Sequence, residues 1–293
     1  MVNKENIYQR REVDLGEIVN RIKIEDHKNI PDIILTIGPC RSGTTALLRL
    51  FGATGIKSYY QPIKTILRWL LLDEDKEMTH TWEIPKSSLI YLKETLGPYT
   101  FAESKLNPLT VLSGVLDEDT MKRKIHVLIM GREPSDTWYS WKTYFANENI
   151  TIETLFENFN HAYKTVEEIR QEAIKNSMKV MHFVYEASQY PEVAVASLFK
   201  RLGIENPPVL YGWNNLPEMG TEGSNIFLPD ESQPFIVEGI HDKIKNADSL
   251  RFYRSKGNEL SEKEKNGIMK VNLYDIYSIW RTQTQIDLNV AIN

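Results

Sequence analysis

The sequence contains a single cysteine, Cys40, in 293 residues. An intrachain disulfide is therefore excluded, and so is a zinc site made of several cysteine thiolates. Long apolar runs are also missing, since the longest, "ILRWLLL" at 66–72, is far shorter than the roughly 20 residues that span a bilayer. The segment 1–26 is charged throughout and lacks the apolar centre of a signal peptide. We therefore expect a cytoplasmic protein with no membrane partner.

An excess of positive charge is absent as well. The formal net charge is -5 and the isoelectric point is near 5.8, whereas a nucleic-acid interface normally needs a basic face. The sequence shows no internal repeat and no low-complexity tract. Its 41% of apolar and 26% of charged residues are ordinary for a globular chain that buries a sizeable core. The sequence thus predicts one domain, 1–293, that binds no nucleic acid.

Short and nearly continuous apolar runs are present, and they are typical of strands buried in a parallel sheet. We expect such strands at 32–38, 99–103, 125–131 and 179–185, with a weaker one at 56–60. Helical patterns lie between them, and they begin at 44, 64, 86, 134 and 151. Strands that alternate with helices predict an α/β fold, a three-layer sandwich with a central parallel β-sheet of the P-loop NTPase-like kind.

Two segments depart from this alternation. Residues 64–98 hold helical patterns at 64–78 and 86–97 and form a helical insertion before the next expected strand. Residues 205–248 are rich in proline and glycine and carry no regular pattern. Because long irregular segments in compact domains are commonly lids or binding loops, we expect this segment to act as a lid. A helix at 261–280 follows near the end of the chain.

The loop "GPCRSGTT" at 38–45 joins the first expected strand to a helix. Such a unit turns backbone N–H groups and the positive end of a helix towards an anion. In nucleotide triphosphatases the loop reads G-x-x-x-x-G-K-[ST], but here Thr44 occupies the lysine position and the cation is Arg41. The strands at 125–131 and 179–185 also end without an Asp that could hold magnesium. A kinase or ATPase would therefore lack both its lysine and its clearest metal ligand.

Cys40 raises a second hypothesis, since thiol phosphatases use a cysteine, five intervening residues and an arginine. Counting from Cys40 puts Ala46 where that arginine is required. The spacing therefore excludes a phosphatase loop, and we interpret Cys40 as a small residue that fills a tight turn.

The segment "PCRSGTTALL" at 39–48 resembles the 5'-phosphosulfate loop of the sulfotransferase family, commonly written P-[KR]-[SA]-G-[TS]-[TS]-x-[LF]. Cys40 is an extra residue between the proline and the arginine. The resemblance implies that the donor is 3'-phosphoadenosine 5'-phosphosulfate (PAPS). Its sulfate and 5'-phosphate would be bound by Arg41, Ser42, Gly43, Thr44 and Thr45.

A second match follows the expected strand at 125–131. Four residues fit the family's 3'-phosphate motif R-x-P-x-D-x-x-x-S: Arg132, Pro134, Asp136 and Ser140. The chemistry is coherent, because proline suits a first helical turn, a carboxylate there meets the positive end of the helix, and arginine offers a forked cation to phosphate. The resemblance implies that Arg132 and Ser140 bind the 3'-phosphate of the donor.

Two later segments extend the resemblance. Tyr185 and Glu186 match the start of the family's Y-E-D-L segment, with Ala187 in place of the acid, and the resemblance puts Tyr185 at the donor. The stretch "FYRSKGNELSEKE" distantly resembles the basic R-K-G segment that closes over the 3'-phosphate, with a solvated charged loop as the alternative. The residues concerned are Arg254, Lys256 and Gly257.

Sulfuryl transfer is an in-line displacement at sulfur, in which positioning and electrostatic stabilisation dominate. Because the transferred group carries less negative charge than a phosphoryl group, fixed arginines and backbone amides can replace magnesium. The resemblance thus implies no metal, with Arg41 neutralising charge on the leaving phosphate and adenosine 3',5'-bisphosphate as the product. The acceptor would be a small molecule with a hydroxyl or an amine.

The acceptor also benefits from a general base. Many members of the family place a histidine, in a K-T-H segment, where the strand before the 3'-phosphate strand ends. Here we place that position in "FAESKLNP", so Glu103 is the first candidate for the base and Lys105 for a cation near the sulfate. The alternative is that Glu103 pairs with Lys105 or another basic residue. His80 is the reserve base, because the family's glutamate before a proline is here Gln61, a neutral amide.

The sequence therefore predicts a PAPS-dependent sulfotransferase with a small-molecule acceptor. Two alternatives stay open: a P-loop kinase-like phosphotransferase, and a non-catalytic relative that kept the nucleotide loops. A homodimer is also left open.

Overall fold

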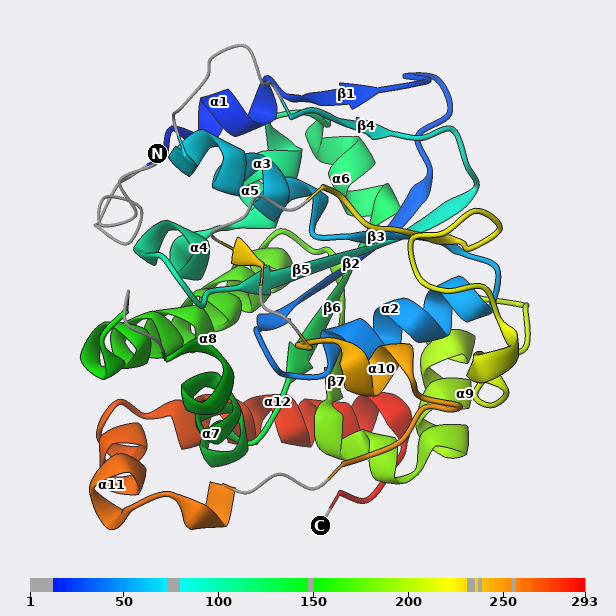
Figure 1. Ribbon diagram of the computed structural model, residues 1–293. Helices are drawn as coiled ribbons and strands as arrows, with labels where there is room; N and C mark the ends of the chain where they lie inside the picture. Colours follow the sequence, from blue (N-terminus) through cyan, green and yellow to red (C-terminus); the bar gives the residue numbers. More distant parts are fainter. Residues whose placement is uncertain are drawn as a thin grey trace.

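The computed structural model describes residues 13–72, 80–146, 150–230, 235–236, 239–253 and 257–292. A six-stranded parallel sheet runs through its centre in the order β7-β6-β2-β5-β3-β8 (Figure 1). Its strands are β2 Asp32–Pro39, β3 Lys57–Tyr60, β5 Leu89–Leu96, β6 Ile125–Gly131, β7 Lys179–Val184 and β8 Ile226–Phe227. A separate two-stranded parallel pair joins β1 Ile22–Ile24 to β4 Trp82–Ile84.

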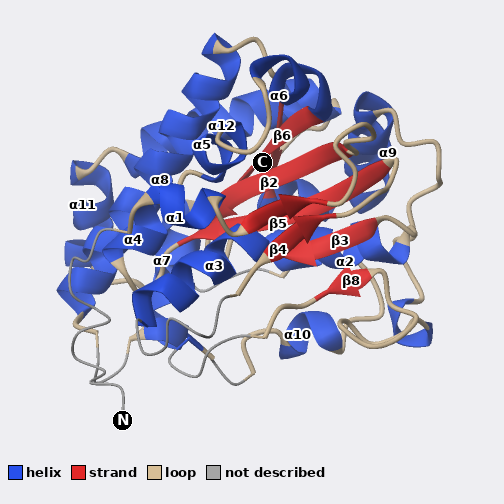
Figure 2. Cartoon of the chain, turned by 90° about the horizontal axis from the view of Figure 1, so that it is seen from above, coloured by secondary structure: helices blue, strands red, loops and turns tan. Residues whose placement is uncertain are grey.

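Helices flank the sheet on both sides, which confirms the expected three-layer α/β sandwich (Figure 2). The helices before the lid segment are α1 Leu15–Val19, α2 Thr44–Ala53, α3 Pro62–Leu72, α4 Phe101–Lys105, α5 Pro108–Ser113, α6 Glu118–Lys124, α7 Pro134–Phe145, α8 Ile152–Lys175 and α9 Pro191–Leu202. The helices within and after segment 205–248 are α10 Asp242–Lys245, α11 Glu262–Lys270 and α12 Leu273–Leu288. In the described part of the chain, none is long and apolar enough to cross a bilayer.

The central strands form where the sequence is continuously apolar. In β2, Ile33, Leu35 and Ile37 are fully buried, as expected for a strand covered on both faces. The register sets Leu35 opposite Leu92 of β5 and Val127 of β6. The expected strands at 32–38, 125–131 and 179–185 are confirmed, and so is the long helix predicted from 151.

Two neighbouring predictions were wrong. The segment 86–97, expected as a helix, contains the central strand β5, and 99–103, expected as a strand, runs into helix α4. The polar residues of β5 resembled one face of a helix, although they are buried with tertiary partners. The start of α4 is set by Thr100, whose hydroxyl accepts from the Glu103 N–H while Glu103 caps Thr100 in return.

The two unusual segments are also clearer in the structure. The insertion expected at 64–98 holds most of α3, but also β4 and the central strand β5, so it is not purely helical. The described residues of segment 205–248 are mostly irregular, yet β8 among them pairs with β3 at the edge of the sheet. The helix expected at 261–280 is two helices, because Asn272 adopts a left-handed conformation (φ 62°) between α11 and α12.

Candidate functional site

A cavity opens beyond the carboxyl end of β2. In chain order, β3 and β5 pair on one side of β2, while β6 and β7 follow on the other. This reversal at β2 creates the kind of crevice in which open α/β sheets bind ligands. The cavity has a volume of about 410 Å³, within the range of small-molecule sites.

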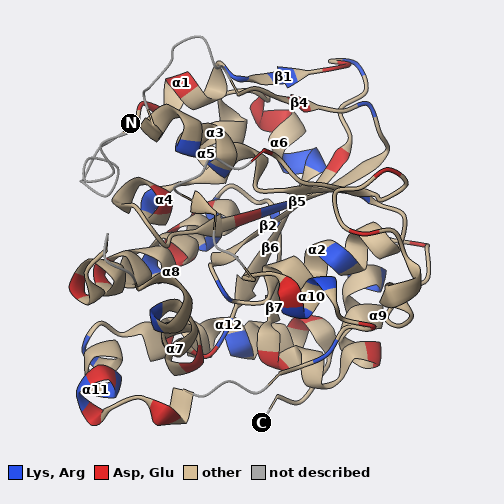
Figure 3. Ribbon diagram, viewed as in Figure 1, with Lys and Arg blue, Asp and Glu red and all other residues tan. Residues whose placement is uncertain are grey.

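The cavity is strongly cationic. Of the residues that the structure describes, six basic ones line it: Arg41, Lys64, Arg68, Lys93, Arg132 and Lys243. Among its described lining residues there is no Asp or Glu, although the whole chain is net negative. By contrast, the outer helix α11 carries charges of both signs (Figure 3). A cavity of this charge selects an anion.

The loop between β2 and α2 forms one wall. Gly43 is the N-cap of α2 at φ 91° and supplies no side chain, so the first turn of α2 lacks a side-chain cap. A Cβ on Gly43 would lie 2.5 Å from Cδ2 of Tyr185, which leaves room for glycine alone. An uncapped helix start beside Arg41 is suited to an anion.

Most of the loop residues expected at the donor face the cavity. Arg41, Gly43, Thr44 and Thr45 line it. Ser42 does not, because its hydroxyl is buried and donates to the carbonyl of Pro39 at 2.8 Å. Its side chain therefore stabilises the turn.

The two motifs meet in space. Nε of Arg41 donates to the hydroxyl of Ser140 at 2.9 Å, and Nη1 of Arg132 donates to the carbonyl of Arg41 at 3.0 Å. The guanidinium of Arg132 lies over the ring of Tyr185, 4.6 Å from its centre. Its buried Nε has no hydrogen-bond partner among the described residues. Arg132 thus has an N–H donor that no described residue satisfies, which is consistent with a ligand at this position.

A C-terminal segment crosses this wall. The hydroxyl of Tyr185 accepts from the N–H of Tyr253 at 2.9 Å, and Asp136 accepts from the N–H of Gly257 at 3.0 Å. A Cβ on Gly257 would lie 2.4 Å from Asp136 Oδ1, so the close approach requires glycine. The other two residues expected here, Arg254 and Lys256, lie outside the described residues.

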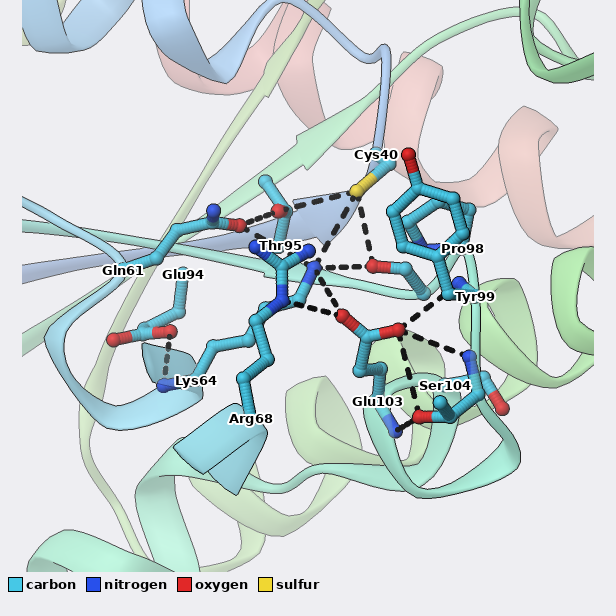
Figure 4. A network of polar contacts seen from close by, with 12 residues as sticks. Cys40, Gln61, Lys64, Arg68, Glu94, Thr95, Pro98, Tyr99, Glu103 and Ser104 are labelled. Carbon is cyan, nitrogen blue, oxygen red and sulfur yellow. Dashed lines mark hydrogen bonds and ion pairs between the residues drawn. The ribbon is translucent and has the colours of Figure 1, made fainter. Parts of the chain in front are cut away.

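Glu103, the first candidate for the base, is buried beside the cavity and is absent from its lining. One oxygen accepts from Nε of Arg68 at 2.7 Å and lies 3.6 Å from Nζ of Lys64. The other accepts from the N–H groups of Tyr99 and Thr100, each at 2.9 Å (Figure 4). Burial opposes its ionisation, but the two cations and the hydrogen bonds lower the pKa of Glu103. Its contacts are those of a buried counterion.

The structure also changes which strand end corresponds to the family's histidine position, because 99–103 is not a strand. The strand before β6 in the chain is β5, so its end reads Lys93, Glu94 and Thr95. Lys93 and Thr95 line the cavity. Glu94 instead accepts from the N–H groups of Ile63 and Lys64 at the start of α3, at 2.8 and 3.3 Å, and burial raises its pKa to about 7. This strand end supplies a cation and a hydroxyl.

The remaining sequence candidates lie elsewhere. His80 stacks on Trp69, with ring centroids 6.2 Å apart, and is not part of the cavity lining. Lys105 lies in the last turn of α4, also outside the lining. Neither is brought to the loop residues.

The sequence interpretation missed His241. It lines the cavity from the start of α10, and its Nε2 lies 2.7 Å from the hydroxyl of Tyr60. Burial, together with Lys93, Arg41 and Lys245, lowers the pKa of His241 to about 3. The signal was present in the sequence, because a histidine within an expected lid is a candidate for the site that the lid covers.

A scan against protein-family models and a search of curated proteins found no match for this chain. Among the described residues, no group of three or more His, Cys, Asp or Glu is placed to hold a metal ion. The features of the site are a cationic cavity, an uncapped helix start and two arginines, Arg41 and Arg132, in contact with each other.

Proposed function

We propose that this protein is a sulfotransferase that moves a sulfuryl group from PAPS to a hydroxyl or an amine of a small molecule. One observation carries the proposal. The two segments that resemble the family's phosphate motifs, 91 and 99 residues apart at their contacts, meet through Arg41, Arg132 and Ser140 at the carboxyl edge of the sheet. A chance pair of motifs would not be expected to converge on one cationic cavity.

The residues present fit such a donor. Arg41, Thr44, Thr45 and the start of α2 would hold the sulfate and the 5'-phosphate, in a P-loop-like arrangement. Arg132, with its unpartnered Nε, would bind the 3'-phosphate beside Ser140. The donor contributes an activated sulfate whose leaving group is a phosphate. The protein supplies fixed positive charge where negative charge grows on that leaving group.

Ligand binding separates this proposal from its rivals. Adenosine 3',5'-bisphosphate should bind in calorimetry and raise the melting temperature, while ATP with magnesium should do so far less. The reverse order would favour a phosphotransferase. Binding of the bisphosphate without any transfer of labelled sulfate, in a metabolite extract, would favour a non-catalytic relative.

A further inference from the structure

Among the described residues, one histidine, His241, lines the cavity. It lies at the N-cap of α10, while its partner Tyr60 ends β3. The two rings meet edge to face with centroids 5.3 Å apart, and Nε2 lies 2.7 Å from the phenol oxygen. This contact spans 181 positions of the sequence. The expected lid and the sheet edge therefore meet at this pair.

Neighbouring contacts put the pair at the sulfate end of the cavity. The carbonyl of Ile240, next to His241, accepts from Nη1 of Arg41 at 3.0 Å. Lys93 of β5 lies over the ring of Tyr60, with Nζ 3.6 Å from its centre. Arg132, assigned to the 3'-phosphate, instead contacts Tyr185. The pair is thus joined to the residue assigned to the sulfate.

The field around His241 favours a neutral ring. Among the described residues, the charged groups that act on it are Lys93 from β5, Arg41 from the loop before α2 and Lys245 from α10, all of them cations. The imidazole therefore keeps a lone pair at neutral pH. A bound donor adds negative charge, and this raises the pKa of His241 towards the range in which a base is effective.

We infer that the His241–Tyr60 pair is the general base that accepts the proton of the acceptor. This inference rests on the proposed sulfuryl transfer. As the acceptor atom bonds to sulfur, the bond from sulfur to the 5'-phosphate oxygen breaks, and its electron pair leaves with adenosine 3',5'-bisphosphate. The acceptor proton passes to the Tyr60 oxygen while the phenol proton passes to Nε2 of His241.

The test uses His241→Gln and Tyr60→Phe, with His27→Gln as the matched control, because His27 is exposed and remote from the cavity lining. Labelled PAPS is supplied with water, a weakly acidic alkylphenol or an acidic nitrophenol as acceptor. Both pair variants should lower kcat about 10²- to 10⁴-fold with the alkylphenol and far less with the nitrophenol, which is largely ionised and needs no base. Their affinity for adenosine 3',5'-bisphosphate and the control's turnover should match the wild type.

The pH profile separates a base from a structural role. Wild-type kcat should fall on the acid side as the imidazole is protonated, and this limb should disappear in His241→Gln. Unchanged turnover in His241→Gln, or an equal loss with both phenols, would overturn the inference while the proposed function stands. A wild-type protein that neither binds adenosine 3',5'-bisphosphate nor releases labelled sulfate would remove the proposed function itself.

Discussion

At the scale of single residues, Arg132 joins the loop before α2 to Tyr185 and lines the cavity. Its Nη1 binds the backbone of Arg41, its face rests on Tyr185, and its Nε has no partner among the described residues. An arginine whose position is fixed by two contacts can offer its other N–H donors to a ligand with little loss of side-chain freedom.

Removing this side chain should therefore discriminate between nucleotides. Arg132→Ala should weaken adenosine 3',5'-bisphosphate by about 1.5 to 3 kcal/mol, the value of a charge-assisted hydrogen bond, and weaken adenosine 5'-phosphate much less. Isothermal titration calorimetry measures both. The matched control is Arg123→Ala, which removes an exposed arginine that pairs with Asp119 on α6. Equal weakening of the two nucleotides would show that Arg132 does not contact the 3'-phosphate.

Glu103 stabilises the fold through a buried ion-pair network. It is the acidic partner of Lys64 and Arg68, and all three side chains are nearly or fully buried. Removing one partner of a buried ion pair leaves the other charges uncompensated, so Glu103→Gln should lower the free energy of unfolding by about 3 to 5 kcal/mol. Urea denaturation measures this loss.

The pH dependence follows from the lowered pKa of Glu103. A carboxyl whose pKa is lower in the folded state than the ordinary 4.5 stabilises the fold above that value, and the stabilisation is lost as the pH falls through the lowered pKa. Glu103→Gln should flatten this acid loss. The control Glu118→Gln breaks an exposed pair with Lys122 and should cost well under about 1 kcal/mol. A stable Glu103→Gln protein that has lost turnover would support Glu103 as the base and contradict a purely structural role.

At the scale of elements, the glycine that starts α2 decides how closely the loop approaches Tyr185, the residue directly after β7. Gly43 and Gly55 have nearly the same backbone, with φ 91° and 90°. A Cβ on Gly43 meets Tyr185 at 2.5 Å, whereas one on Gly55 meets nothing within 4 Å. The two glycines therefore separate backbone strain from steric contact.

Gly43→Ala should displace the loop from Tyr185 and weaken adenosine 3',5'-bisphosphate more than about tenfold, or about 1.4 kcal/mol. Gly55→Ala carries the same left-handed strain, of about 1 to 2 kcal/mol, and should leave the affinity unchanged. Calorimetric titration and thermal unfolding of both variants check this. Similar affinities in the two variants would mean that the contact with Tyr185 does not shape the site.

Some strands could be predicted from the sequence pattern, and others could not. Strands β2, β6 and β7 follow from apolar runs because both faces of each strand are covered. Strand β5 was missed because Lys93, Glu94 and Thr95, near its end, are polar. Tertiary contacts explain why they are buried: Glu94 accepts from the N–H groups at the start of α3, and Lys93 lies over the ring of Tyr60. Helix α4 could have been predicted, since Thr100 and Glu103 have the spacing of a capping box.

At the scale of the whole molecule, a chain with net charge -5 encloses a cavity lined by cations. Two buried acidic residues lie outside the cavity lining. Glu103 of α4 accepts from Arg68 of α3, and Glu94 of β5 accepts from the N–H of Ile63 at the start of α3. The described lining therefore offers arginines and lysines where a magnesium site would need carboxylates.

We therefore expect sulfate transfer to proceed in EDTA at the rate seen in magnesium buffer, because fixed cations supply the charge. Transfer of labelled sulfate before and after chelation measures this, and a known magnesium-dependent kinase in the same buffers verifies that the metal was removed. Turnover that EDTA abolishes and magnesium restores would require a metal ligand that the cationic lining lacks.

The sequence by itself determined the features that depend on neighbours along the chain. The apolar runs of β2 and β6, the glycine spacing before α2 and the proline after Arg132 are local, so the two motifs proposed to bind the donor could be found from the sequence. The tertiary structure decided what depends on distant partners. It paired Glu103, the first candidate for the base, with Arg68, and it brought His241 to Tyr60 across 181 residues. No pattern along the chain encodes such contacts, because they arise only when β3, α3 and the segment before α10 pack around one cavity.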